Sequence, residues 1–162
     1  MSVEDNTSST GYRIYTKAER ERRDATVWTL VQGVLAPLQF VVFLASLALV
    51  IRYLLTGEGY EIATVSIVLK TLVLYAIMVT GSIWEKVVFG KWLFARPFFW
   101  EDVFSFVVIA LHTLYLWALS TASLSPAELM TVALAAYAAY VVNAGQFLRK
   151  LRLARMEAAS AA

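Results

Sequence analysis

Three carboxylic acids stand where long apolar runs of this sequence end. Glu85 follows the apolar run 62–84, and Glu101 and Asp102 immediately precede the run 103–127. If both runs are helices whose ends lie at one level, the three carboxyl groups converge there. Crowded carboxyl groups that are partly withdrawn from water can keep a proton near neutral pH, which suits general acid and base catalysis. Alternatively, Glu85 is an ordinary interfacial residue, and Glu101 and Asp102 favour the positive N-terminal end of a helix.

Three other polar residues lie deeper inside the apolar runs, namely Gln39, Lys70 and His112. We expect each to lie about eleven to fourteen positions further in, which is roughly 16–20 Å along a helix. Lys70 could extend its side chain outward to the nearest Glu residues, become neutral, or meet an anionic group of a ligand. His112 is the single histidine; it could ligate a metal within a macrocycle, transfer protons, or form a structural hydrogen bond to another helix.

The composition argues against several other kinds of site. The chain has no Cys and one His, which excludes Cys-ligated zinc and iron–sulfur clusters and argues against a metal held by the protein. A Gly-rich phosphate loop, an HExxH motif and a nucleophile elbow are missing from the sequence. The net charge is only +2, and basic residues are not interleaved with aromatic ones as nucleic-acid binding requires. We therefore expect neither a metal site nor a nucleic-acid partner.

The elements that position these residues are membrane-spanning helices. Of the 162 residues, 60% are hydrophobic and 16% are charged, whereas soluble domains have about 45–50% and 25%. Four runs, 25–51, 62–84, 103–127 and 129–148, contain no charged residue except Lys70, and about 20 residues are enough to cross a bilayer. We predict an all-α polytopic membrane protein with a membrane domain over 25–150. Its four spans are expected at about 28–54, 62–84, 102–121 and 127–148.

The distribution of Lys and Arg predicts the orientation. Basic residues occur in the N-terminal segment 1–24, between the second and third spans, and around the C-terminal tail 151–162, whereas 56–61 and 120–128 contain none. Because Lys and Arg are retained on the cytoplasmic side, both termini should be cytoplasmic. Within the polar N-terminal segment, Thr16 and Glu19 have the spacing of a capping box that begins a short surface helix.

The loop between the second and third spans is rich in aromatic residues. Trp84, Trp92 and Trp100 suit the membrane interface, and we expect a re-entrant or surface-lying segment between Glu85 and Glu101. The last span contains many Ala residues together with Asn143 and Gln146, a pattern typical of close helix packing or self-association.

Three stretches resemble the 3-vinyl bacteriochlorophyllide hydratase family of photosynthetic bacteria. They are WTLVQGVLAPLQF at 28–40, GSIWEKVVFGKWLFARPFFWEDVFS at 81–105 and NAGQFLRKLR at 143–152, and the likeness extends over about 12–157. The resemblance implies a hydro-lyase of bacteriochlorophyll biosynthesis in the bacterial inner (intracytoplasmic photosynthetic) membrane. The expected reaction adds water to the C3-vinyl group of chlorophyllide a or 3-vinyl bacteriochlorophyllide a, giving the 3-(1-hydroxyethyl) product. No cofactor is implied, because magnesium is carried by the tetrapyrrole substrate.

This reaction requires an acid that protonates the vinyl group and a base that orients water, and Glu85, Glu101 and Asp102 are the candidates. Glu101 and His112 are eleven residues apart, about 16 Å along a helix, so His112 cannot hold the magnesium while Glu101 acts on the vinyl group. We favour catalysis by Glu85 and Glu101, with His112 structural or touching another edge of the macrocycle. For the propionate, Arg96 is preferred to Lys70 because it lies at the interface. The predicted substrate-binding residues are Trp84, Trp100, Arg96, Lys70, His112 and Gln39.

One alternative is a non-enzymatic tetrapyrrole-binding or assembly protein of the photosynthetic membrane, with His112 as a pigment ligand. The expected partners are the lipid bilayer and a magnesium tetrapyrrole such as chlorophyllide a. A homo-oligomer and contacts with neighbouring pathway enzymes are left open by the sequence.

Overall fold

The computed structural model describes residues 13–160, and helices are its only regular elements over that range. They are α1 (Lys17–Ala25), α2 (Val27–Thr56), α3 (Tyr60–Phe89), the short 3-10 helix η1 (Arg96–Phe98), α4 (Phe99–Ser120) and α5 (Pro126–Ser160). Four of the helical segments are long and apolar enough to cross a membrane. The predicted all-α fold with four membrane-spanning helices is therefore confirmed. Residues 1–12 of the predicted N-terminal segment and 161–162 of the predicted tail lie outside the described residues.

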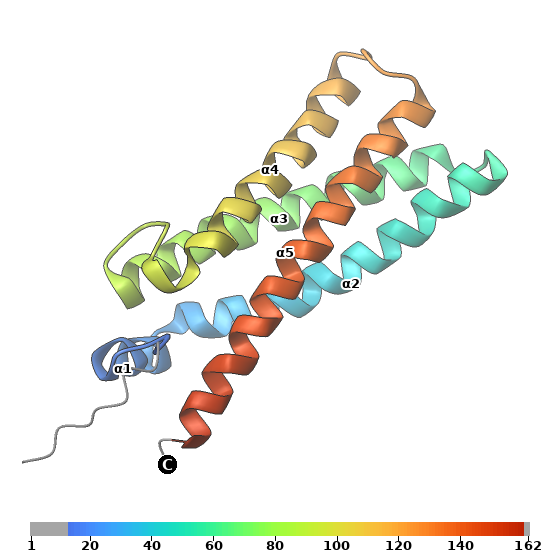
Figure 1. Cartoon of the computed structure of the whole chain (residues 1–162). Helices are drawn as coiled ribbons and strands as arrows, with labels where there is room; N and C mark the ends of the chain where they lie inside the picture. Colours follow the sequence, from blue (N-terminus) through green and yellow to red (C-terminus); the bar gives the residue numbers. More distant parts are fainter. Residues whose placement is uncertain (1–12, 161–162) are drawn as a thin grey trace, which may run out of the picture.

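The four long helices form two hairpins (Figure 1). Helix α2 packs mainly against α3, and α4 packs mainly against α5, while the contacts between the two hairpins are fewer. The turn between α2 and α3 is short because Gly57 adopts a left-handed backbone with φ of 74° and ends α2. We call the boundary between the two hairpins the seam.

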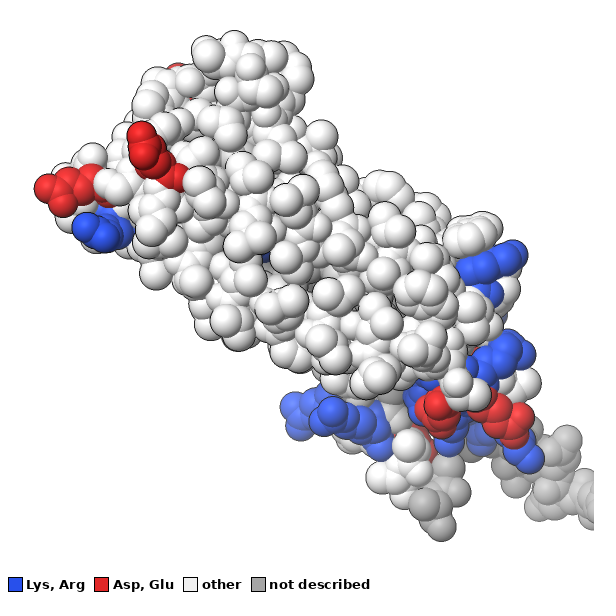
Figure 2. All heavy atoms as spheres, turned by 180° about the vertical axis from the view of Figure 1, so that it is seen from behind, with Lys and Arg blue, Asp and Glu red and all other residues white. Residues whose placement is uncertain are grey.

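Charged residues lie at the two ends of the molecule and leave a broad uncharged belt between them (Figure 2). Lys and Arg gather at one end, where α1 and the last turns of α5 lie, and the opposite end carries mainly acidic residues. Large apolar side chains such as Leu30, Val41 and Leu72 are exposed on the helices, as expected for surfaces that lipid covers. The protein is thus a multi-pass membrane protein, and its cytoplasmic termini stay a prediction.

A hydrogen-bonded group in the bundle interior connects three of the helices. The Tyr137 hydroxyl of α5 lies 2.6 Å from the Ser46 hydroxyl of α2, which lies 2.7 Å from the Ser66 hydroxyl of α3. Aromatic and small residues pack around this group, and the Phe43 ring meets the Tyr137 ring edge-on at 5.4 Å. Because each hydroxyl finds a partner, these polar groups are tolerated in an apolar interior.

The short first helix docks against the basic end of the bundle. It begins with the predicted capping box, in which the Thr16 hydroxyl accepts the Glu19 amide and the Glu19 carboxylate accepts the Thr16 amide. The Arg22 guanidinium donates to the Val88 carbonyl at 2.8 Å. The Ile14 amide donates to the Glu157 carboxylate at 3.2 Å, so the first and last described segments are joined.

Two boundaries differ from the sequence prediction. The loop in which a re-entrant or surface-lying segment was expected is shorter than predicted, because α3 runs on to Phe89 and ends only where Gly90 adopts φ of 78°, and α4 already begins at Phe99. What remains is a strap, residues 90–95, followed by η1. Helix α5 also continues through the predicted tail to Ser160, since Leu, Lys, Arg, Met and Ala in this segment are good helix formers and no breaker interrupts them.

Candidate functional site

The three candidate acids meet where α3 ends and α4 begins. Glu85, Glu101 and Asp102, here called the carboxyl cluster, are 5%, 6% and 3% exposed. The carboxyl groups of Glu85 and Asp102 are close enough to share a hydrogen bond, and Glu101 is close enough to act electrostatically on both. Two carboxyl groups can form such a bond only when a proton lies between them. The pair is therefore chemically suited to donating a proton.

The strap holds both members of this pair through its backbone. The Phe94 amide donates to the Asp102 carboxyl at 2.7 Å, and the Ala95 amide donates to the Glu85 carboxyl at 3.1 Å. Phe94 has φ of 58°, a left-handed conformation that costs about 1–3 kcal/mol for a residue other than Gly. The two amides favour the ionised carboxylates. They would stabilise the negative charge that remains after the pair has released its proton.

Glu101 has a different partner. Its carboxylate lies 3.2 Å from the Lys150 ammonium of α5, and the two side chains are only 8% and 18% exposed. Lys150 also donates to the Pro97 carbonyl. The Lys150 ammonium can thus balance the negative charge of a carboxylate at this position, and a carboxylate can act as a general base. Lys150 is not among the site residues predicted from the sequence.

A second contact from α5 fixes the first turn of α4. The Asn143 side-chain amide donates to the Glu101 carbonyl at 2.9 Å and to the Ser105 hydroxyl at 3.1 Å. The Ser105 hydroxyl donates to the same Glu101 carbonyl at 2.8 Å. Asn143 thus forms the interhelical bonds that its position suggested. Its spacing with Lys150, seven residues or two helical turns, is the sequence signal that could have indicated a common partner on α4.

Beside the carboxyl cluster lies an exposed aromatic surface, formed by Phe94, Phe99, Trp100 and Phe106. The Phe94 ring stacks on Phe106 with centroids 5.5 Å apart, and it lies 5.6 Å from the Phe99 ring. Trp100 is 65% exposed and contacts Phe99. Because the Phe94 amide bonds to Asp102, a flat apolar ligand on this surface would lie next to the cluster. Arg96 is exposed at the start of η1.

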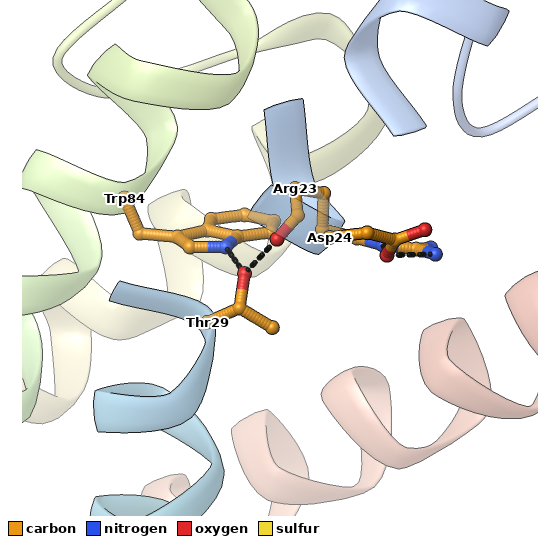
Figure 3. Close-up of polar contacts among 4 residues, drawn as sticks. All are labelled: Arg23, Asp24, Thr29 and Trp84. Atoms are coloured by element: carbon orange, nitrogen blue, oxygen red, sulfur yellow. Dashed lines mark hydrogen bonds and ion pairs between the residues drawn. The ribbon is translucent and has the colours of Figure 1, made fainter. Parts of the chain in front are cut away.

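Trp84 does not belong to this aromatic surface (Figure 3). Its indole donates to the Thr29 hydroxyl at 2.9 Å, and that hydroxyl donates to the Arg23 carbonyl at 2.6 Å. The ring also meets Phe98 edge-on at 5.5 Å. Trp84 therefore joins α1, α2 and α3.

The deeper residues lie apart from the carboxyl cluster. Lys70, His112 and Gln39, here called the deep polar group, are 0%, 0% and 3% exposed. Of the three alternatives for Lys70, outward extension is wrong, because its ammonium lies 3.7 Å from the centre of the Tyr140 ring inside the bundle. The ten residues from Asp102 to His112 correspond to about 15 Å along α4.

The basic end of the molecule also has an open hollow. It lies between the N-terminal segment and the last turns of α5, and it is lined by Ile14, Lys150, Leu153, Met156, Glu157 and Ser160. Lys150 belongs both to this hollow and to the ion pair with Glu101. The hollow therefore approaches the carboxyl cluster from the basic end.

Comparison with known proteins gives consistent matches over most of the chain. Residues 15–153 match the family model described as 2-vinyl bacteriochlorophyllide hydratase. A protein of that name from Rhodobacter capsulatus is 69% identical over 147 residues, which cover 91% of this chain and 85% of the relative. Its namesake from Cereibacter sphaeroides is 68% identical over 145 residues, which cover 90% of each chain. No solved structure matches the chain.

Proposed function

Because the chain belongs to the 2-vinyl bacteriochlorophyllide hydratase family, we propose that it adds water to the C3-vinyl group of chlorophyllide a or 3-vinyl bacteriochlorophyllide a. The prefixes 2-vinyl and 3-vinyl denote the same substituent in two numbering schemes for the macrocycle. The protein is a hydro-lyase of bacteriochlorophyll biosynthesis. The names of the relatives favour this enzyme over the pigment carrier considered from the sequence. We place the protein in the bacterial inner (intracytoplasmic photosynthetic) membrane.

The hydrogen-bonded pair of Glu85 and Asp102 carries this proposal, because hydration of a vinyl group begins with a proton. The π electrons of the vinyl group form a C–H bond at the terminal carbon with the proton that the pair shares. The inner carbon becomes a cation, which is stabilised by conjugation with the macrocycle. The Phe94 and Ala95 amides stabilise the two carboxylates that are left.

Water then attacks the cationic carbon and forms the C–O bond. The Glu101 carboxylate, paired with Lys150 at 3.2 Å, accepts the proton that the water loses. That proton returns to the pair of Glu85 and Asp102, so each turnover consumes one water and no net proton.

The aromatic surface accounts for binding of the macrocycle. The flat ring enters from the lipid and lies against Phe99 and Trp100, where stacking and apolar burial hold it. The exposed Arg96 pairs with the propionate at the membrane interface. Magnesium stays in the macrocycle throughout and is part of the substrate.

The test uses membranes from a host that expresses only this chain, incubated with chlorophyllide a and analysed by absorption and mass. We expect the pigment to gain the mass of one water and its long-wavelength band to shift to the blue, because vinyl conjugation is lost. A pigment that binds but does not change in mass would overturn the proposal. A parallel incubation with 3-vinyl bacteriochlorophyllide a shows which macrocycle is converted faster.

A further inference from the structure

The deep polar group has no role in the steps described above, although it is costly to bury. Within residues 13–160, the Lys70 ammonium, the His112 Nε2 atom and the Gln39 Oε1 atom have no hydrogen-bond partner. Lys70 lies ten residues from the start of α3, about 15 Å into the helix. An ionisable residue at this depth is expensive and usually marks a binding or transport site.

The surroundings of Lys70 do not satisfy its ammonium. The Tyr140 and Tyr137 rings lie 3.7 Å and 5.8 Å away and attract a cation, but a ring face offers no lone pair to the three N–H donors. The Tyr137 hydroxyl is already bonded to Ser46. In the described part of the chain, the ion pairs of the acidic side chains involve Arg23, Arg52 and Lys150, not Lys70.

The Nε2 atom of His112 is a hydrogen-bond acceptor near Lys70. Its Nδ1 lies 2.7 Å from the Val108 carbonyl, which can only accept, so Nδ1 carries the proton. In the neutral ring, Nε2 therefore has a free lone pair. Lys70 is near enough for its charge to act on this imidazole. A donor from α3 and an acceptor from α4 thus both lie near the Tyr137 ring, at the seam.

The distance along α4 from His112 to the carboxyl cluster is comparable to the width of the proposed substrate. Glu101 and His112 lie on the same buried face of α4, and Asp102 and His112 are about 15 Å apart along the helix. A tetrapyrrole has a comparable reach from a substituent on one edge to a substituent on the opposite edge. With the vinyl group at the cluster, the opposite edge of the ring would reach the deep polar group. In chlorophyllide a, that side carries a ring ketone, an ester and the propionate.

We propose that Lys70 binds an oxygen acceptor of the tetrapyrrole on the side of the ring away from the vinyl group. This inference rests on the proposed function. The Lys70 ammonium donates to the oxygen, which is the ring ketone or, if Arg96 does not hold it, the propionate. This contact fixes how far the ring enters the seam. The seam can open for the ring because the two hairpins share fewer contacts than the helices within each hairpin. Opening at this level breaks the hydrogen bond between Tyr75 and Thr113, which is exposed and 2.6 Å long.

The first test compares Lys70→Met with Ser46→Ala, a matched change at a buried polar residue whose partners are all within the protein. Equilibrium binding of chlorophyllide a to the full chain in nanodiscs is followed by absorption and fluorescence. Lys70→Met should bind about 10- to 100-fold more weakly, as expected for loss of a hydrogen bond from a charged group, whereas Ser46→Ala should bind like wild type. The pigment-free Lys70→Met protein should unfold at the same or a higher temperature, because an unpaired buried charge is removed.

A structural lysine would give the opposite pattern, with a lower unfolding temperature and unchanged affinity, and this result would overturn the inference. If the wild-type chain neither binds nor hydrates chlorophyllide a, the proposed function itself fails. If the wild-type chain hydrates the pigment and Lys70→Met binds it equally well, only the Lys70 inference fails.

The second test identifies the oxygen. Binding is measured for chlorophyllide a, for its derivative with the ring ketone reduced to a methylene, and for its propionate methyl ester. One altered pigment should bind the wild-type chain more weakly than chlorophyllide a, and Lys70→Met should no longer distinguish those two pigments. If Lys70→Met no longer discriminates against the methylene derivative, the ketone is the oxygen that Lys70 binds. If it no longer discriminates against the methyl ester, the propionate is that oxygen. If Lys70→Met discriminates against both altered pigments as strongly as the wild-type chain does, Lys70 does not contact either oxygen and the inference is overturned.

Discussion

Replacing Glu85 by Gln removes the acidic proton from one member of the carboxyl pair while leaving its shape almost unchanged. The carbonyl oxygen of Gln can still accept the Ala95 amide, which lies 3.1 Å from the present carboxyl. Its NH₂ group can donate to Asp102, in place of the shared proton. The unfolding free energy should therefore change by less than about 1 kcal/mol.

The rate of hydration, by contrast, should fall steeply in Glu85→Gln. Loss of a general acid typically lowers a rate by about 10²- to 10⁴-fold, which corresponds to about 2.7–5.4 kcal/mol in the barrier. Initial rates are measured from the mass and absorption of the hydroxyethyl product, and pigment affinity is measured on the same preparation. Affinity should stay within a few-fold of wild type, because the aromatic surface is untouched.

Glu157→Gln is the matched control for this prediction. Glu157 is also at the basic end of the molecule, where its carboxylate accepts the Ile14 amide. Because it lies outside the carboxyl cluster, the rate of hydration by Glu157→Gln should stay near that of wild type. Asp102→Asn should behave like Glu85→Gln for the same reasons. If Glu85→Gln and Asp102→Asn both keep more than about a tenth of the wild-type rate, the pair is not the acid.

Three further predictions concern the supports of the site. Lys150→Met should lower kcat by about tenfold or more with little change in pigment affinity, because Glu101 loses its ion pair. Lys150→Arg should keep most of the wild-type rate, and equal rates in the two variants would contradict this role of Lys150. Phe94→Asn should raise KM with kcat nearly unchanged. Asn tolerates the left-handed backbone and keeps the amide contact with Asp102, but it loses the stacking on Phe106. An unchanged KM would argue against binding of the macrocycle to the aromatic surface. Tyr137→Phe should lower the unfolding free energy by about 1 kcal/mol without slowing hydration, because it removes only the hydrogen bond to Ser46. Thermal unfolding in detergent measures the change in stability. A large loss of hydration rate would instead give Tyr137 a part in the reaction.

The number of spans could be predicted because it depends on the length of the apolar runs. The lateral pairing of helices could not, since it depends on how each helix is rotated about its axis. Lys70 illustrates the difference. Its depth in the second run is clear from the sequence, but only the fold shows that its side chain turns inward to Tyr140 on another hairpin.

Convergence of the three acids could likewise be anticipated from their positions at neighbouring helix ends. The partners of these acids could not. Lys150 looks like one more basic residue on the cytoplasmic side, and its partner Glu101 is 49 positions away in the sequence. The amides of Phe94 and Ala95 carry no sequence signal, because any residue except Pro has a backbone N–H.

The contact between Ile14 and Glu157 joins residues that are 143 positions apart. A ribosome delivers the first of them long before the second, and α5 is the last helix to enter the membrane. Until then Glu101 lacks its lysine, and the first turn of α4 lacks Asn143. The order of synthesis thus delays maturation of the acid site until α5 has been made, so a nascent chain that lacks α5 would reach the membrane without a finished catalyst.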